Sequence, residues 1–317
     1  MAAPNTTTAD LANLVTTAYD RKVNMALRSK AQFRSIVDTK PVQQTHPGDS
    51  IVFNLYSDLS PATTPLNEVT DPTGVTIGDT TPVTVTLNEY GNYTVVTKRL
   101  QEFALDSALD SNLANIVAQN ELDSIDKLVE SVMAGSTNVI TEEAGSLVGP
   151  GGAGQNVNDI TGTDTLKSKH IRYAVAKNRA GSVPAVRGEL FGAYIHPDVA
   201  HDLRAESGSL GWRVPHEYQA GEAIWAAEVG TYEGVFFVEN PRCGASTNTG
   251  TVDVYRTYIF GQQAVAEAVA EEFHVVLDGA ITDPLNRKTA MGWYGIAGWS
   301  LYRPTCLTVV KTASSIA

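Results

Sequence analysis

The chain has 317 residues, a formal net charge of −12 at pH 7 and 43% hydrophobic residues. This length predicts roughly two domains, or one large domain, with ample apolar residues for a core. The ordinary globular composition excludes a disordered chain, and the acidic total opposes binding to a polyphosphate unless basic residues gather in one place.

Basic residues do gather at the start of the chain. Up to Pro47 there are six basic and three acidic residues, a balance of +3 that leaves −15 for the remainder. The basic residues of this arm are Arg21, Lys22, Arg28, Lys30, Arg34 and Lys40. Because opposite charges attract across an interface, we expect the arm to contact an acidic neighbour.

The chain has two cysteines and shows no pattern typical of an export signal or a membrane span. Cys243 and Cys306 lie far apart in the sequence, so we expect both thiols to be free. The first ten residues lack a basic flank followed by an apolar core, and no stretch approaches eighteen uninterrupted apolar residues. We therefore expect a protein made and kept in a reducing, soluble compartment, with no membrane contact.

The arm, residues 1–47, is predicted to contain one amphipathic helix from about residue 10 to residue 28. Its apolar residues keep near-helical spacing, namely Leu11, Leu14, Val15, Ala18 and Met25. The arm then turns polar and ends at Pro47.

Two strands and a long loop are predicted next. Residues 50–56 and 83–87 alternate in the manner of half-buried strands. The segment that joins them, residues 57–82, is rich in Thr, Asp, Pro and Gly and is too long for a tight hairpin turn. Loops of this length are usually functional or disordered.

Residues 98–134 contain no Gly or Pro and predict a long helix that stops at Gly135. Its apolar stripe consists of Ala118, Leu122, Ile125, Val129, Val132 and Met133. The stripe slips near residues 106–112, so a short helix followed by a long one is an equally good interpretation.

The second half of the chain predicts a compact α+β domain. A linker rich in Gly, Pro and Asn spans residues 145–162 and marks an inner domain boundary. A helix at 165–180, a strand at 190–195 and a short helix at 197–205 follow. Further strands are predicted at residues 235–238, 254–260 and 273–277.

No group of residues makes a convincing catalytic or metal site. His196 and His201 invite a metal ion, but their spacing of five does not place them on one helix face, and we interpret His196 as part of a strand-to-helix turn. His216, Glu217 and Tyr218 are neighbours in sequence and point different ways, which favours a surface loop.

Two glycine-rich runs also lack a completed motif. Residues 207–211 space glycine wrongly around either serine for a nucleophile elbow, and residues 149–154 lack the Lys-Ser/Thr pair of a nucleotide loop. The aromatic residues near the C-terminus are expected to pack in the core, where Trp and Tyr bury large areas. These are Trp293, Tyr294, Trp299 and Tyr302.

Three segments carry a family resemblance. They read DPLNRKTAMGWY at residues 283–294, followed by an apolar aromatic stretch to residue 302, AEVGTYEGV at 227–235 and IFGQQA at 259–264. In this order they resemble the major capsid proteins of tailed phages, and within these the HK97-like branch that includes the coats of the N-four-like phages. The resemblance is strongest from about residue 185 to residue 305.

The resemblance implies an α+β subunit with an HK97-like capsid fold. It assigns residues 1–47 to an N-terminal arm, 48–97 to an extended β-loop that lies over an adjacent subunit, and 98–162 to a peripheral domain with a long spine helix. It assigns residues 163–282 to an axial domain about the hexamer or pentamer axis, and 283–317 to a return to the peripheral domain.

The implied function is that of a major capsid protein, not an enzyme. Such a subunit forms hexamers and pentamers that close into an icosahedral shell around double-stranded DNA, without sequence-specific contacts, cofactor or metal. Scaffolding and portal proteins are the implied partners, and the implied location is the virion, after assembly in the host cytoplasm. Contacts between subunits are expected from the arm and the loop, at Arg21, Lys22, Arg28, Arg34, Asn67, Glu68 and Asp71.

Two other interpretations remain open from the sequence. A non-viral shell protein similar to the encapsulins would share fold and assembly but recruit a cargo enzyme. A cytosolic hydrolase would use His196 or His216 as its acid–base group.

Overall fold

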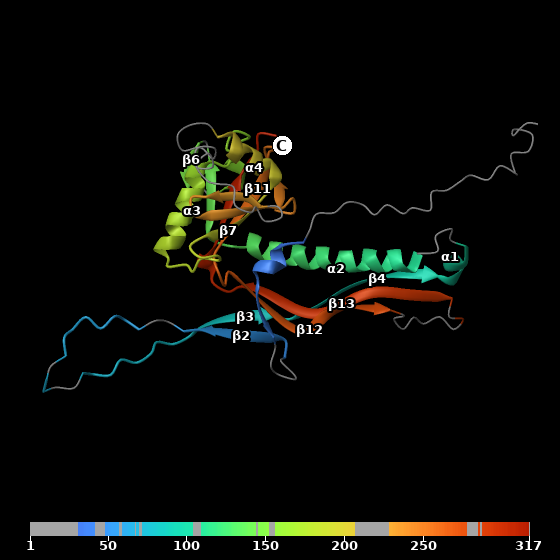
Figure 1. Cartoon of the computed structure of the whole chain (residues 1–317), viewed down its shortest axis with the longest axis horizontal. Coiled ribbons are helices and arrows are strands. Elements are labelled where there is room, and N and C mark those ends of the chain that lie inside the picture. Colours follow the sequence, from blue (N-terminus) through green and yellow to red (C-terminus); the bar gives the residue numbers. More distant parts are fainter. Residues whose placement is uncertain are drawn as a thin grey trace, which may run out of the picture.

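The computed structural model describes residues 31–41, 48–56, 59–66, 68–69, 72–103, 109–143, 145–151, 156–206, 228–277, 285 and 287–316. These residues form an elongated α+β body, with one sheet under a long helix and a second sheet stacked at one side (Figure 1). The predicted arm helix at residues 10–28 and His216 lie outside the described residues.

The first sheet has four strands in the order β1-β12-β13-β4. Its strands span Asp38–Pro41 (β1), Val265–Leu277 (β12), Lys288–Leu301 (β13) and Asn88–Thr97 (β4). β1 runs parallel to β12, and the other two pairs are antiparallel. Strands from both halves of the sequence therefore build one sheet, so neither half can complete it alone.

The second sheet has eight strands, seven of which follow the order β6-β5-β14-β11-β7-β9-β8, while β10 also pairs with β11. Its strands span Val139–Glu143 (β5), Ser146–Val148 (β6), Phe191–Ile195 (β7), Glu228–Tyr232 (β8), Val235–Glu239 (β9), Ala245–Thr247 (β10), Asp253–Phe260 (β11) and Leu307–Thr312 (β14). The pairs β5–β14 and β7–β9 are parallel. The largest core cluster lies around this sheet.

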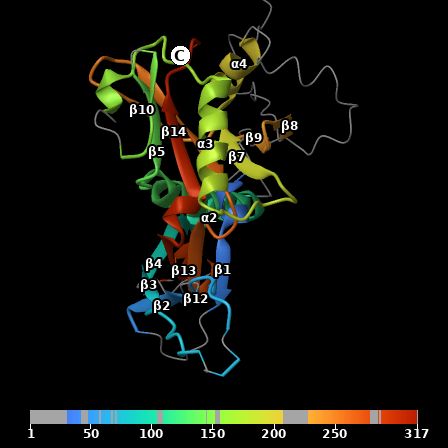
Figure 2. The same ribbon diagram turned by 90° about the vertical axis from the view of Figure 1, so that its left-hand side faces the viewer.

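The long helix α2, Leu109–Ala134, crosses the four-stranded sheet, and the short helix α1, Lys98–Phe103, precedes it. Figure 2 looks along α2 and shows it between the two sheets. Of the two helical interpretations of residues 98–134, the structure has the short helix followed by the long one. Val117, Ile125, Val129 and Met133 are buried, but Leu122 of the predicted stripe is 49% exposed.

Helix α3, Ser168–Ala180, and helix α4, Pro197–Ala205, accompany the second sheet (Figure 1). Three short 3-10 turns lie at Phe33–Ile36 (η2), Val157–Asp159 (η3) and Pro304–Cys306 (η4). α4 has the predicted bounds, because Pro197 occupies the first turn and His196 accepts a hydrogen bond from the backbone N–H of Asp198. α3 begins three residues later than predicted, since Thr165 instead bridges to Ala313.

The predicted strand pair is present as an antiparallel hairpin of β2, Ser50–Leu55, and β3, Thr81–Thr86. The segment between these strands projects from one end of the body, while α1 lies at the other end (Figure 1). Cys243 and Cys306 are free and buried, which confirms the prediction for the thiols. Among the described residues, no helix is long and apolar enough to cross a membrane.

Candidate assembly site

The hairpin β2–β3 is anchored to the four-stranded sheet at its base. Val85, Leu87 and Ala268 form a small buried cluster, against which Ile51 and Phe53 pack. The hairpin base lies close to strand β13 at Gly298, where an added Cβ would lie 2.1 Å from the carbonyl oxygen of Thr86. The close approach of the hairpin base to β13 therefore requires glycine at position 298.

Beyond its base the hairpin is exposed. Its outer residues present large apolar side chains to solvent, namely Tyr56, Leu59, Leu66, Val69, Val75 and Ile77. Val69 is 91% exposed and Leu66 is 77% exposed. Apolar side chains gathered on a protruding segment are typical of a protein–protein contact surface.

A second feature fixes the start of the described chain to the body. Phe33 in η2 is fully buried, and its ring meets those of Tyr194 and Tyr258 edge-on at centroid distances of 5.1 and 5.8 Å. The carboxylate of Asp126 in α2 accepts hydrogen bonds from the backbone N–H groups of Gln32, at 2.9 Å, and Phe33, at 2.7 Å. Ring burial and backbone capping thus hold this turn against α2.

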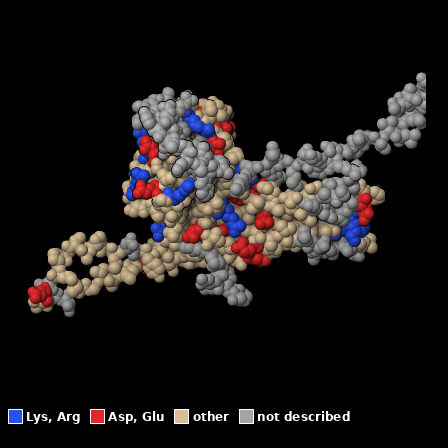
Figure 3. Space-filling model, viewed as in Figure 1, with Lys and Arg blue, Asp and Glu red and all other residues tan. Residues whose placement is uncertain are grey.

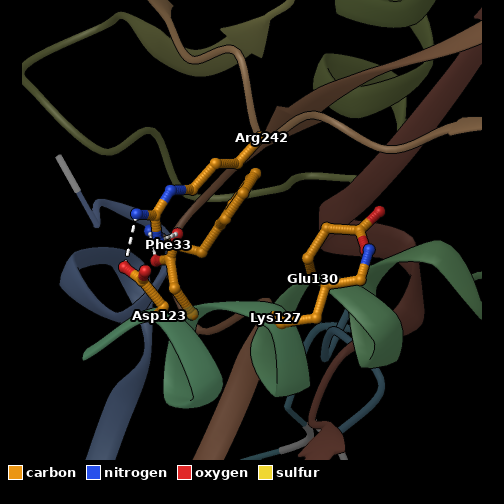
Figure 4. A pocket seen from close by; sticks show the side chains of 6 residues that line it. Phe33, Asp123, Lys127, Glu130 and Arg242 are labelled. Carbon is orange, nitrogen blue, oxygen red and sulfur yellow. Dashed lines mark hydrogen bonds and ion pairs between the residues drawn. The ribbon is translucent and has the colours of Figure 1, made fainter. Parts of the chain in front are cut away.

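Charged side chains surround Phe33 and line a cavity of about 320 Å³ (Figure 4). Arg242 donates to Asp123 at 2.5 Å and lies 3.5 Å from Asp126. Burial raises the pKa of Asp126, although the N–H of Phe33 and the charge of Arg242 oppose this shift. The carboxylate and the guanidinium belong to different elements, so the pair also ties α2 to the loop after β9.

Glu130, one helical turn after Asp126, is also buried and paired. It accepts hydrogen bonds from Tyr258 at 2.5 Å, Lys127 at 2.9 Å and Arg256 at 3.2 Å. Burial raises the pKa of Glu130, but the hydrogen bonds from Tyr258 and Lys127 outweigh burial and bring it below its ordinary value. The cavity therefore holds ion pairs that connect elements, and its carboxylates are engaged in structure.

Arg34 extends the same anchoring to the four-stranded sheet. Its Nε donates to the fully buried carboxylate of Glu267 at 2.9 Å. Thr39 Oγ1 and Trp299 Nε1 donate to the same carboxylate at 2.7 and 3.0 Å. Glu267 thereby joins η2, β1 and β13, each of which contributes one donor.

The structure places the predicted contact residues in two regions. Arg34 pairs with Glu267 inside its own subunit, and its side chain is 36% exposed. Glu68 is exposed in the segment between β2 and β3, which projects from one end of the body (Figure 1). The other predicted contact residues lie outside the described residues: Arg21, Lys22, Arg28, Asn67 and Asp71. Their role at subunit contacts stays a prediction.

Sequence reasoning overlooked the exposed apolar residues of the hairpin loop and the part played by Gly298. The loop residues did carry a signal, because five large aliphatic residues lie in a segment that contains neither Lys nor Arg, namely Leu59, Leu66, Val69, Val75 and Ile77. Gly298 gave no comparable signal, since its role depends on a strand distant in sequence.

Of the histidines considered as functional groups from the sequence, the structure describes His196 and His201. His196 caps α4, and its ring centroid lies 4.7 Å from that of Tyr255 with the two rings tilted by 36°. Burial lowers the pKa of His196. His201 is 58% exposed and lies 3.4 Å from Asp202. Within the described ranges, no three His, Cys, Asp or Glu side chains form a group that could hold a metal ion. Of the four aromatic residues predicted to pack in the core, Trp293 and Tyr302 are buried, whereas Tyr294 and Trp299 are only partly buried.

A family model described as phage capsid protein matches residues 5–305. No curated protein matches the sequence. Among solved structures, the capsid of Ralstonia phage GP4 is similar at a TM-score of 0.71 and 13% identity, over 95% of this chain and 96% of that chain. The cyanophage Pam1 capsid gives a TM-score of 0.69 at 14% identity, over 99% of this chain and 100% of that chain. The capsid of an empty GTA particle gives 0.58 at 14% identity, over 99% and 100%.

Proposed function

This chain belongs to the phage capsid protein family, whose model spans residues 5–305, and we propose that it is a shell subunit that closes into an icosahedral particle around double-stranded DNA. The family is one of structural proteins of the virion, and the fold is that of HK97-like capsid proteins over nearly the whole chain. The hydrolase interpretation is therefore wrong.

One observation carries the mechanism of assembly. The hairpin loop is anchored at its base by Val85 and Leu87, yet its outer part exposes Leu66 and Val69 far from the core. Among the described residues these side chains stay largely exposed, and burying them against another copy would remove this area from water. We propose that the loop lies on an adjacent subunit of a hexamer or pentamer.

The N-terminal arm is the second proposed contact. Its balance of +3 against a remainder of −15 favours an acidic surface on a neighbour. Arm and loop together give each subunit several weak contacts, which act at high effective concentration once a capsomer has begun to form. Assembly is therefore steeply dependent on protein concentration.

Finer assignments extend this proposal. The three sequence segments at residues 227–235, 259–264 and 283–294 favour the N-four-like branch of the family. Scaffolding and portal proteins are the proposed partners. The four-stranded sheet with α2 is proposed as the peripheral part of the subunit and the eight-stranded sheet as its axial part. These two sheets do not follow the predicted boundaries at residues 162 and 282, since β12 pairs with β13 and β14 pairs with β5. The boundaries themselves stay predictions.

The test is negative-stain electron microscopy with sedimentation analysis across protein concentration, on the whole chain and on a variant that lacks residues 1–30. The whole chain is expected to form closed shells or rings of five and six above a threshold concentration. The truncated chain is expected to fold but not to form shells. A whole chain that stays monomeric or dimeric at every concentration, even with candidate scaffolding protein, would contradict the proposal.

A further inference from the structure

Basic residues gather around helix α3 more strongly than in the N-terminal arm. Residues 165–188 contain six basic and no acidic residues, a balance of +6 that leaves −18 for the remainder of the chain. The six are Lys167, Lys169, Arg172, Lys177, Arg179 and Arg187. An acidic protein can still contact a polyphosphate where its cations are concentrated, and this segment is such a place.

One side of α3 packs on the second sheet. The buried residues of the helix are Ser168, His170, Ile171, Ala174, Val175 and Asn178. Asn178 accepts a hydrogen bond from Thr308 of β14 at 3.1 Å, which joins this side of the helix to the sheet. The other residues of α3 are exposed or partly exposed, and they include four cations but no carboxylate.

These exposed and partly exposed residues form one surface, which we call the α3 face. At ~3.6 residues per turn they all project to the same side of the helix. The α3 face consists of Lys169, Arg172, Tyr173, Ala176, Lys177, Arg179 and Ala180. Figure 2 shows α3 in front of the second sheet, on the outside of the subunit. Figure 3 shows basic atoms in the area where Figure 1 places α3, together with some acidic ones.

Three cations of the α3 face have no carboxylate partner among the described residues, namely Arg172, Lys177 and Arg179. The Nε of Arg172 is buried and has no hydrogen-bond partner there either. Lys169 differs, since it donates to the buried Glu142 at 2.8 Å. The helix dipole favours cations in the last turn, which accounts for Lys177 and Arg179 in part but not for Arg172.

A row of unpaired cations matches a chain of phosphates. From Lys169 to Arg179 the α3 face extends about 15 Å, at ~1.5 Å per residue. Phosphates of one DNA strand follow one another every ~3.4 Å along the duplex axis, so about four of them fit this length. Ala176 and Ala180 lie one turn apart in the middle of the face, where their small side chains permit a close approach to the helix.

We propose that the α3 face binds phosphate groups of the enclosed double-stranded DNA and therefore lines the inside of the shell. The inference rests on the proposed function and deepens it by naming the surface that meets the DNA. Contacts to phosphates carry no base information, so binding is independent of sequence. Each subunit contributes few charges and binds weakly, and many subunits acting together hold the DNA.

Fluorescence anisotropy tests the inference, with the full-length chain below its assembly threshold and a labelled DNA duplex of about 30 base pairs. The wild type should bind this duplex with an affinity that falls as salt rises. The double variant Lys177→Gln, Arg179→Gln should bind about tenfold more weakly at low salt. It should also lower the slope of log affinity against log salt by about two, because two phosphate contacts are lost.

The matched control is the double variant Lys98→Gln, Arg99→Gln. It removes the same charge from exposed residues of α1, which lies at the other end of the body from α3 (Figure 1), and should bind the duplex like the wild type. This control separates an effect of the α3 face from an effect of total charge.

Closed shells give a second readout. Because the α3 face is proposed to line the inside, wild-type shells assembled without DNA should bind little added duplex compared with unassembled subunits. The Lys177→Gln, Arg179→Gln variant should still form shells in electron micrographs, since neither residue belongs to the proposed arm or loop contacts.

The outcomes separate the inference from the proposed function. Equal binding by the wild type and the Lys177→Gln, Arg179→Gln variant, or intact shells that bind duplex as well as subunits do, would overturn the inference and leave the shell function standing. Displacement of the labelled duplex by polyglutamate as effectively as by unlabelled duplex would also overturn it, and would assign the α3 face to an acidic protein. A wild-type chain that never assembles would instead contradict the proposed function itself.

Discussion

The junction around Phe33 and the outer hairpin loop use similar residue types in opposite ways. At the junction, an aromatic ring and the carboxylates of Asp126 and Glu130 are buried, and each carboxylate has donors from other elements. In the loop, Leu66 and Val69 are exposed and Glu68 lies on the surface. The difference supports our proposal that the junction stabilises the subunit and that the loop acts between subunits.

The largest effect on stability is expected from Phe33→Ala. Removing a fully buried ring that contacts Tyr194 and Tyr258 leaves a cavity, and we expect the free energy of unfolding to fall by about 3–5 kcal/mol. Phe103→Ala is the matched control, since Phe103 is 78% exposed, and should change it by less than about 0.5 kcal/mol. Denaturant unfolding measures the free energy of unfolding of both variants. An equal decrease in the two would contradict the distinction between the buried junction and the exposed surface.

Acid should weaken the subunit through His170. This side chain is fully buried, its Nδ1 accepts the backbone N–H of Lys167 at 3.0 Å, and its Nε2 lies 2.6 Å from the Glu142 carboxylate. Because Nδ1 accepts, the neutral ring carries its proton on Nε2, facing Glu142. Burial lowers the pKa of His170 to about 4, although Glu142 opposes this shift.

The sign of the pH effect follows from that lowered pKa. The unfolded chain protonates this histidine near pH 6.5, whereas the folded chain does so only near pH 4. Stability is therefore complete above pH 6.5 and falls by up to about 3 kcal/mol as pH drops to 4. The free energy of unfolding of His170→Gln should depend less on pH over this range than that of the wild type. His201→Gln, which changes an exposed histidine, should show the pH dependence of the wild type. An unchanged slope in His170→Gln would refute the assignment.

Gly298→Ala should act on both regions, because Gly298 lies where the hairpin meets the body. The added Cβ must displace Thr86, which we expect to cost about 1–3 kcal/mol and to shift the whole loop. Gly74→Ala is the control, since no atom lies within 4 Å of its added Cβ. Thermal unfolding and particle yield would both be measured. A Gly298 variant with full yield would show that the hairpin angle is not constrained at this point.

The smallest effect on stability is expected from Val69→Ser, and here the readout is assembly. Val69 is 91% exposed, so the free energy of unfolding should change by less than about 0.5 kcal/mol. The threshold concentration for assembly should nevertheless rise, because every contact in the shell loses buried apolar area. A clear drop in melting temperature would instead assign Val69 to the fold of the subunit.

Local patterns predicted several elements from the sequence. Alternation identified β2 and β3, and the Pro197 turn gave α4 with its correct bounds. These patterns predicted β12 only from Phe273, although it begins at Val265. Eight other strands were overlooked, namely β1, β4, β5, β6, β8, β10, β13 and β14. The first half of β12 is rich in Ala and Glu, which favour helices, and only its pairing with β13 makes it a strand.

The candidate site was predicted in outline but not in detail. The length and composition of the loop predicted a long connection between two strands, because such features are local to the sequence, and its function stays a proposal. The buried pairs of Asp126 and Glu130 could not be predicted, since their partners Phe33, Arg242 and Tyr258 lie elsewhere in the chain. The same holds for the contact between Gly298 and Thr86.

The most direct test of the central claim replaces residues 56–80, which join the paired residues Leu55 and Thr81, by a two-residue Asn-Gly turn. This chain is compared with the wild type by sedimentation velocity and thermal unfolding. The account predicts a folded subunit with nearly the wild-type melting temperature that forms no shells at concentrations where the wild type does. Shells of normal size from the shortened chain, or a subunit that no longer folds, would contradict the claim that the loop acts between subunits and the junction within them.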